Sequence, residues 1–203
     1  MLCQCYKMLH FVLFASGSNL SYNSRSLNHL HHSNTHFYIT HFVLSPINTY
    51  LLSVIVSKVT GKTVAQYLDE RVFGHLGIDE WIWEESPQGY SAGGWGLYIK
   101  AEDLAKFGLL WLNKGVWNGH RIIGEEWITE ATGCHIIPHE GQCNGYGYQV
   151  WLYLHDSFRF HGSRGQIMLA IPEKNVILVA TSAHNDDQRI INSFFENFYN
   201  QLP

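Results

Sequence analysis

The stretch FRFHGSRGQIMLAIPEKNVILVAT, residues 158–181, contains three short apolar runs separated by turn residues. The runs Phe158–His161, Gln166–Ile171 and Val176–Thr181 are rich in β-branched and aromatic side chains and have the length of strands. Pro172-Glu-Lys-Asn175 has the composition of a hairpin turn. Because so short a connection can join only antiparallel neighbours, this stretch predicts an antiparallel sheet.

Helix signals surround these strands. Ser45-Pro46 has the N-cap and first-turn residues of a helix that ends at Gly61, with an apolar face at helical spacing formed by Tyr50, Leu51, Val54, Ile55 and Val59. We expect the further elements to be a capping-box helix from Thr63 to Phe73, helices at Glu102–Asn113 and Glu125–Ala131, a strand at Tyr146–Tyr153, and a last helix capped by Asn185–Gln188. The predicted fold class is α+β, an antiparallel sheet covered by helices.

The amino-acid composition and the apolar periodicity of the chain change near residue 42. Residues 1–41 hold Ser and Asn clusters and several histidines, with no sustained apolar periodicity, so we expect a segment of low order there and the folded unit at 42–203. Lys7 followed by Met8–Ala15 has only the weak outline of a signal peptide, and cellular location stays open. No stretch reaches the roughly 20 apolar residues of a membrane span.

Charge and cysteine content exclude several classes of protein. The net charge is −4, and the 13 Lys and Arg residues are scattered, which is unlike a nucleic-acid or anionic-membrane binder. Four cysteines are too few and too unevenly spaced for a disulfide framework. With 46% hydrophobic residues the chain is long and apolar enough for one sizeable core.

Several sequence segments resemble those of the β-lactamase and penicillin-binding-protein-like serine hydrolases in residue pattern, order and spacing. They are YLLSVIVSKVTGKT from Tyr50, YLDERVFGHLGI from Tyr67, GGWGL from Gly93, EDLAKFG from Glu102, LNKGVWNG from Leu112, GYGYQ from Gly145 and PEK from Pro172. The resemblance covers residues 42–203 and implies the C-terminal portion of the family's transpeptidase-like fold, incomplete in this chain. It also implies acyl transfer to a serine and hydrolysis of an ester, β-lactam or peptide-like amide, without a cofactor or a metal.

The family's first motif, Ser-x-x-Lys, does not occur in the sequence. A serine hydroxyl needs a base within hydrogen-bond reach to become a nucleophile, and the family's lysine is one helical turn from its serine. The residues three positions before the seven lysines are Gln4, Ile55, Val59, Leu97, Asp103, Trp111 and Ile171. The resemblance therefore predicts a chain with little or no hydrolase activity, a truncated or rearranged copy.

The second motif, Phe-x-Tyr-x-Asn or Ser, aligns with Phe42-Val-Leu-Ser-Pro46. Leu44 stands at the tyrosine position and can neither donate nor accept a proton, and Pro46 has no polar side-chain atom. Ser45 remains as a candidate catalytic hydroxyl, although its position before Pro46 is also that of a helix N-cap.

The third motif, Lys-Thr-Gly or His-x-Gly, falls at His161-Gly162-Ser163, followed by Arg164-Gly165-Gln166. Glycines at a sheet edge let backbone N–H groups approach a substrate carbonyl, which a histidine can orient. The resemblance implies a catalytic role for His161 and a substrate-binding role for Gly162, Ser163, Gly165 and Gln166. An ordinary hairpin bend with a surface histidine explains the same residues.

Two other functions remain open. Gly89-Tyr-Ser91-Ala-Gly93 fits the Gly-x-Ser-x-Gly elbow of α/β-hydrolases, with Asp156 and His184 following in order, although its neighbours are not a strand and a helix. Histidines at His29, His31, His32, His36 and His41 allow a weak, non-catalytic metal binder. If the chain is active, the expected partner is a small ester or amide substrate, and the sequence leaves the oligomeric state open.

Overall fold

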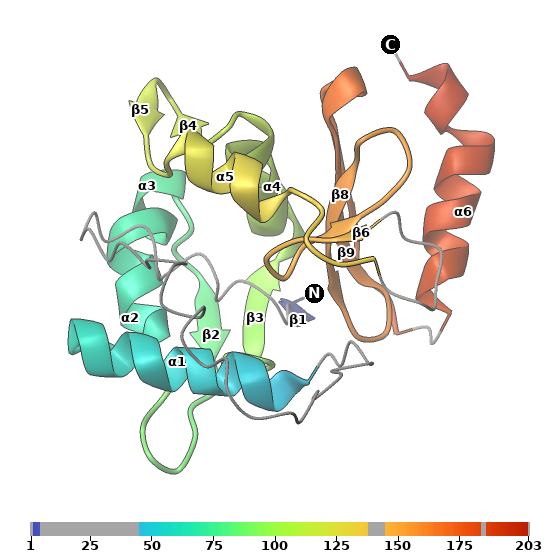
Figure 1. The fold of residues 1–203 in the computed structure, drawn as a ribbon. Helices are drawn as coiled ribbons and strands as arrows, with labels where there is room; N and C mark the ends of the chain where they lie inside the picture. Colours follow the sequence, from blue (N-terminus) through green and yellow to red (C-terminus); the bar gives the residue numbers. More distant parts are fainter. Residues whose placement is uncertain (1, 5–44, 138–144, 184–185, 203) are drawn as a thin grey trace, which may run out of the picture.

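The computed structural model describes residues 2–4, 45–137, 145–183 and 186–202. Its centre is a five-stranded antiparallel sheet with the strand order β10-β9-β8-β7-β6 (Figure 1). The strands are β6 (Gly145–Tyr146), β7 (Trp151–Leu152), β8 (Phe158–Gly162), β9 (Gln166–Ile171) and β10 (Val176–Ala180).

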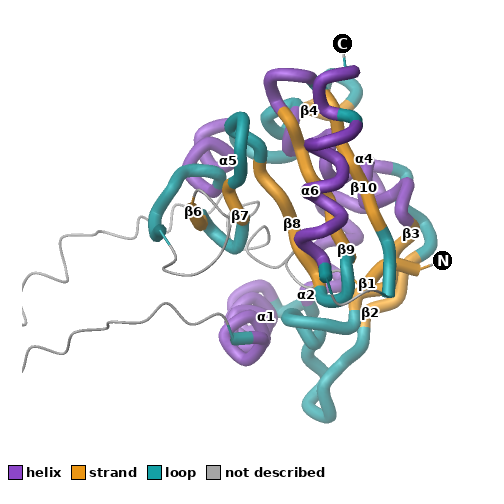
Figure 2. Tube along the Cα trace, turned by 90° about the vertical axis from the view of Figure 1, so that its right-hand side faces the viewer, coloured by secondary structure: helices purple, strands orange, loops and turns teal. Residues whose placement is uncertain are grey.

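Helices cover both faces of this sheet (Figure 2). Alternate residues of β9 point to opposite faces, so that Met168 and Ala170 join the large core beneath α4 (Ala101–Leu112), while Ile167, Leu169 and Ile171 join a smaller core beneath α6 (Asp187–Asn197). The sheet is therefore the middle layer of three.

The remaining elements form a helical lobe with short strands beside the large core. They are α1 (Pro46–Thr60), α2 (Val64–Leu68), the π-helical η3 (Asp69–Phe73), α3 (Gly74–Leu76), α5 (Glu125–Ala131), β1 (Leu2–Gln4), β2 (Trp81–Trp83), β3 (Leu97–Lys100), β4 (Val116–Trp117) and β5 (His120–Arg121). Of the two 3₁₀ turns, η4 (Pro172–Lys174) joins β9 to β10, and η5 (Tyr199–Gln201) follows α6. β3 pairs with β1 and β2, and β4 pairs with β5. The predicted α+β class with an antiparallel sheet is confirmed.

One sequence prediction about an individual element is wrong. The single strand expected at Tyr146–Tyr153 is interrupted, because Gly147 N bonds to Val150 O and Gln149 has a φ of +58°, which makes a turn between β6 and β7. The helix α1 is confirmed, but much of its apolar face is exposed, and the residues that it buries are Thr49, Ser53 and Val56.

The loop before β3 explains which face of α1 is buried. A Cβ atom added to Gly93 would lie 2.9 Å from the Thr49 carbonyl oxygen, and the Ser53 hydroxyl donates to the Ser91 carbonyl oxygen at 2.7 Å. Only small side chains fit where two backbones approach so closely. The larger aliphatic residues of α1 therefore face away from this loop.

No helix in the described part of the chain is long and apolar enough to cross a membrane. The predicted N-terminal segment at 1–41, the signal-peptide outline and the histidine cluster lie almost entirely outside the described residues.

Candidate functional site

The residues of the predicted third motif lie together at the end of one hairpin. β8 ends with His161 opposite Ile167 and Gly162 opposite Gln166, and Ser163, Arg164 and Gly165 make the turn. Arg164 and Gly165 both have positive φ angles, of 61° and 75°. We call residues 161–166 the hairpin tip.

The hairpin tip is fixed to the segment that follows β10. The Ser182 hydroxyl donates to the Arg164 carbonyl oxygen at 2.9 Å, and the Gln166 amide donates to the Ser182 carbonyl oxygen at 2.6 Å. A Cβ atom added to Gly165 would lie 2.2 Å from Ser182 Oγ. Ser182 thus positions the tip, and the sequence contained no signal for this role because serine after a strand is common.

Ser45 lies at the N-terminal end of α1, and the two views place α1 toward the end of the sheet where β8 turns into β9 (Figures 1 and 2). Its side chain accepts a hydrogen bond from Ile47 N at 3.3 Å, and its extended backbone and Pro46 complete the cap. The predicted N-cap is confirmed, while a catalytic role for Ser45 stays a prediction. Leu44 of the second motif lies outside the described residues.

Ser91 is enclosed in the helical lobe. It is 0% exposed, and its hydroxyl accepts a hydrogen bond from Ala65 N in the first turn of α2 at 3.2 Å. It lies in an antiparallel bridge with Glu85, not between a strand and a helix. This geometry favours a structural hydroxyl over the nucleophile of an elbow.

Replacing Ser91 with alanine should therefore reduce stability. The change leaves the buried Ala65 N–H without its acceptor, which costs about 1–3 kcal/mol of unfolding free energy. Urea denaturation measures the loss, with Ser193→Ala as the control, because Ser193 is exposed and its hydroxyl accepts a hydrogen bond from the exposed Asn197 side chain. An unchanged midpoint for Ser91→Ala would contradict the structural role.

Two tyrosines near β6 are poor proton acceptors at neutral pH. Burial raises the pKa of Tyr146, whose ring stacks edge-on against Trp151 at 4.7 Å. The hydrogen bond to the Glu130 carboxylate raises the pKa of Tyr148. Both phenols therefore keep their protons, and neither offers the phenolate that a general base would require.

The described lysines are engaged with groups other than serine hydroxyls. Lys62, Lys100, Lys106 and Lys114 pair with carboxylates of Glu70, Glu80, Asp103 and Glu125. Lys58 lies over the Tyr90 ring at 5.8 Å, and Lys174 donates to the Leu202 carbonyl oxygen at 3.3 Å. Among the described residues, no hydrogen bond joins a serine hydroxyl to a lysine amine.

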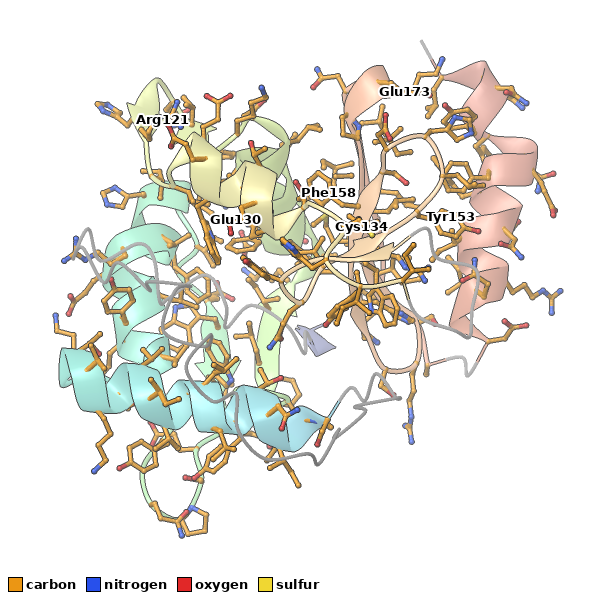
Figure 3. The ribbon with its side chains drawn as sticks, viewed as in Figure 1. Arg121, Glu130, Cys134, Tyr153, Phe158 and Glu173 are labelled. Atoms are coloured by element: carbon orange, nitrogen blue, oxygen red, sulfur yellow. The ribbon has the colours of Figure 1, made fainter. Side chains whose placement is uncertain are left out.

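Polar side chains also gather on the α6 side of the sheet. Tyr153, labelled in Figure 3, donates to Asn192 at 3.3 Å and accepts from Gln188 at 3.0 Å, while the buried Arg159 guanidinium lies 5.2 Å from its ring centre. These contacts join α6 to β8 and to the residue that follows β7. Within the described part, no group of three His, Cys, Asp or Glu side chains could hold a metal ion.

The β-lactamase family model matches residues 40–192, well over half of the chain. The chain belongs to the β-lactamase family. The match begins just before α1 and ends within α6, so it includes the helical lobe apart from β1, the sheet and the hairpin tip. The predicted family is confirmed. No curated protein matches the chain.

Solved structures of β-lactamase-family proteins have the same fold. A protein of Bacillus anthracis assigned as a 6-aminohexanoate-dimer hydrolase is 25% identical, with a TM-score of 0.69 over 80% of this chain. A penicillin-binding protein of Bacillus halodurans (19% identical, TM-score 0.57, 77% of this chain) and a β-lactamase of Mycobacterium bovis (20%, 0.58, 72%) show the fold alone.

The chain spans only part of these relatives. It covers 43% of the Bacillus anthracis protein, 57% of the Bacillus halodurans protein and 58% of the Mycobacterium bovis protein. The incomplete β-lactamase fold that the sequence predicts agrees with this coverage.

Proposed function

We propose that this chain is a part of a serine acyl-hydrolase domain that provides one wall of an acyl-binding site and does not hydrolyse esters, β-lactams or amides by itself. The observation that carries the proposal is the engagement of the described lysines with carboxylates, a carbonyl oxygen and an aromatic ring. Acyl transfer in this family requires a base beside the serine hydroxyl, and no described lysine has such a neighbour.

The hairpin tip is the part of the site that the chain would provide. Gly162 and Gly165 lie at the tip where β8 turns into β9, and the Ser182 bonds hold the backbone of this tip in one arrangement. Preorganised N–H groups at this tip would stabilise the charge on a carbonyl oxygen, and His161 would orient the acyl group. The substrate class would be a small ester, β-lactam or peptide-like amide.

We also propose that two serine hydroxyls, those of Ser45 and Ser91, do not act as nucleophiles. Ser45 caps α1, and Ser91 is buried against Ala65 N, so attack by either hydroxyl would break a helix-terminal hydrogen bond. An α/β-hydrolase mechanism at Ser91 also has no support from the antiparallel sheet. The histidine cluster at 29–41 remains a weaker, non-catalytic alternative.

Steady-state hydrolysis of a chromogenic β-lactam and a nitrophenyl ester tests the proposal. We expect rates equal to those of buffer with the full 203-residue chain and with Ser45→Ala, Ser91→Ala and His161→Ala. Turnover by the unaltered chain that disappears in Ser45→Ala would contradict the proposal and identify Ser45 as the nucleophile. Turnover that disappears in Ser91→Ala would favour the elbow mechanism.

A further inference from the structure

Strands β4 and β5 are joined by a two-residue turn, Asn118-Gly119, at an outer end of the helical lobe (Figure 1). Trp117 pairs with His120 on either side of this turn. Asn118 has a φ of 47° and Gly119 a φ of 79°, and positive φ angles at both central residues are those of a type I′ turn. Asn-Gly is a preferred sequence for such a turn.

No contact with another described element holds the two turn residues. Both residues are exposed, and a Cβ atom added to Gly119 would meet nothing within 4 Å. No hydrogen bond between described residues engages the Asn118 side chain or Gly119 N. The Asn118 amide can therefore approach the next backbone nitrogen without breaking a contact elsewhere in the described structure. Glycine, which has no Cβ, leaves this nitrogen open to the approach.

We propose that Asn118 is a site of spontaneous modification, at which the side-chain amide becomes a carboxylate through a cyclic imide. Because the two groups are neighbours in one chain, the reaction is intramolecular and is favoured by proximity. Gly119 N forms a bond to Asn118 Cγ, the bond from Cγ to Nδ2 breaks, and Nδ2 leaves as ammonia with the proton of the Gly119 N–H. Water then opens the five-membered imide at either carbonyl carbon, which gives aspartate or isoaspartate.

Asn175 provides an internal comparison for the effect of the following residue. It is exposed and left-handed, with a φ of 53°, as Asn118 is. The residue after it is Val176, and a stiff β-branched side chain crowds the backbone nitrogen that would attack. Asn175 should therefore keep its amide under conditions in which Asn118 loses it.

The other Asn-Gly pair of the sequence, Asn144-Gly145, provides a comparison for the effect of the fold. Gly145 is buried and pairs with Leu152 in β6. Attack by its backbone nitrogen would disturb this strand pair, whereas attack by Gly119 N disturbs no described contact. The same dipeptide should therefore react more slowly at 144–145 than at 118–119 in the folded chain.

Isoaspartate at position 118 would add a carbon atom to the backbone of the turn. A two-residue turn sets the register of the strands that it joins, so the added atom would disturb the pairing of β4 with β5. Arg121 in β5 donates to the carbonyl oxygens of Lys114 and Ile123, at 3.0 Å and 3.2 Å. These bonds connect the segment after α4 with the segment before α5, and the modification would weaken that connection.

Liquid chromatography and mass spectrometry of peptides, which separate aspartate from isoaspartate, test the proposal during incubation of the full 203-residue chain at mildly alkaline pH. In the native chain we expect Asn118 to be converted about tenfold faster than Asn175, because Val176 crowds its own nitrogen. Asn118 should also react faster than Asn144. In the urea-unfolded chain Asn118 and Asn144 should react at equal rates, because both precede glycine.

Two variants separate the imide route from direct attack by water. Asn118→Gly should abolish the modification, since glycine accepts the positive φ and carries no amide. Gly119→Ala keeps the amide but places a methyl group beside the attacking nitrogen, so conversion of Asn118 should slow. Native Asn118 that reacts no faster than Asn175, or a reaction that yields aspartate without isoaspartate, overturns the proposal. So does a rate that Gly119→Ala leaves unchanged.

Discussion

Replacing Phe107 with alanine is expected to destabilise the fold by about 3–5 kcal/mol, the usual cost of removing a fully buried aromatic side chain. Phe107 is 0% exposed on α4, and its ring centre lies 5.9 Å from that of Phe160 in β8 and 6.4 Å from that of Trp111. Its loss opens a cavity between the helical lobe and the sheet. Guanidinium denaturation followed by tryptophan fluorescence measures the change.

Leu109→Ala on the same helix is the control for this prediction. Leu109 is 36% exposed and contributes less apolar burial, so its substitution should cost much less than that of Phe107. Equal losses for the two variants would contradict the arrangement in which α4 packs on the sheet through Phe107.

Gly165→Ala is expected to have the next largest effect, because it disrupts the hairpin tip in two ways. The positive φ of 75° costs an alanine about 1–2 kcal/mol. The added Cβ would also lie 2.2 Å from Ser182 Oγ and 2.8 Å from Ile190 Cδ1, an overpacking that adds about 1–3 kcal/mol. The tip would then separate from Ser182 and α6.

Gly61→Ala separates these two contributions. Gly61 has a φ of 72° at the end of α1, and its added Cβ would meet nothing within 4 Å. Thermal or urea denaturation of both variants should therefore show a larger loss for Gly165→Ala, by about the overpacking cost. Equal losses would mean that the tip is not packed against Ser182 and Ile190.

Much of the fold could be predicted from local sequence patterns. The strand at Gln166–Ile171 and the helix at Glu125–Ala131 were predicted with their observed bounds, since turn and cap residues mark both ends of each. The predicted turn at Pro172–Asn175 is present and ends at a left-handed Asn175, and Thr63 and Gln66 form the predicted capping box. These features depend on neighbours in the sequence.

Predictions that depend on distant contacts were less successful. The buried face of α1 is decided by the approach of Gly93 and Ser91, about 40 residues away, so the spacing of its larger apolar residues did not indicate which face is buried. The interruption between β6 and β7 follows from a left-handed Gln149, a conformation for which glutamine gives no signal.

The candidate site was predictable in part. The resemblance placed His161 and the two glycines on one sheet edge, and the structure shows them at the tip of the β8–β9 hairpin. The bonds of Ser182 to this tip and of Ser91 to Ala65 join residues 16 to 26 positions apart, and no local pattern marks them. The catalytic role of His161 and the substrate-binding role of the two glycines remain predictions.

The most direct test of the proposed function is intact-mass spectrometry of the full chain after exposure to a fluorophosphonate, which marks activated serine hydroxyls. A serine without a neighbouring base should react no faster than a free hydroxyl. We therefore predict an unchanged mass, both for the native protein and for a urea-unfolded control. A single stoichiometric adduct that forms only on the native protein would show an activated nucleophile and contradict the proposal.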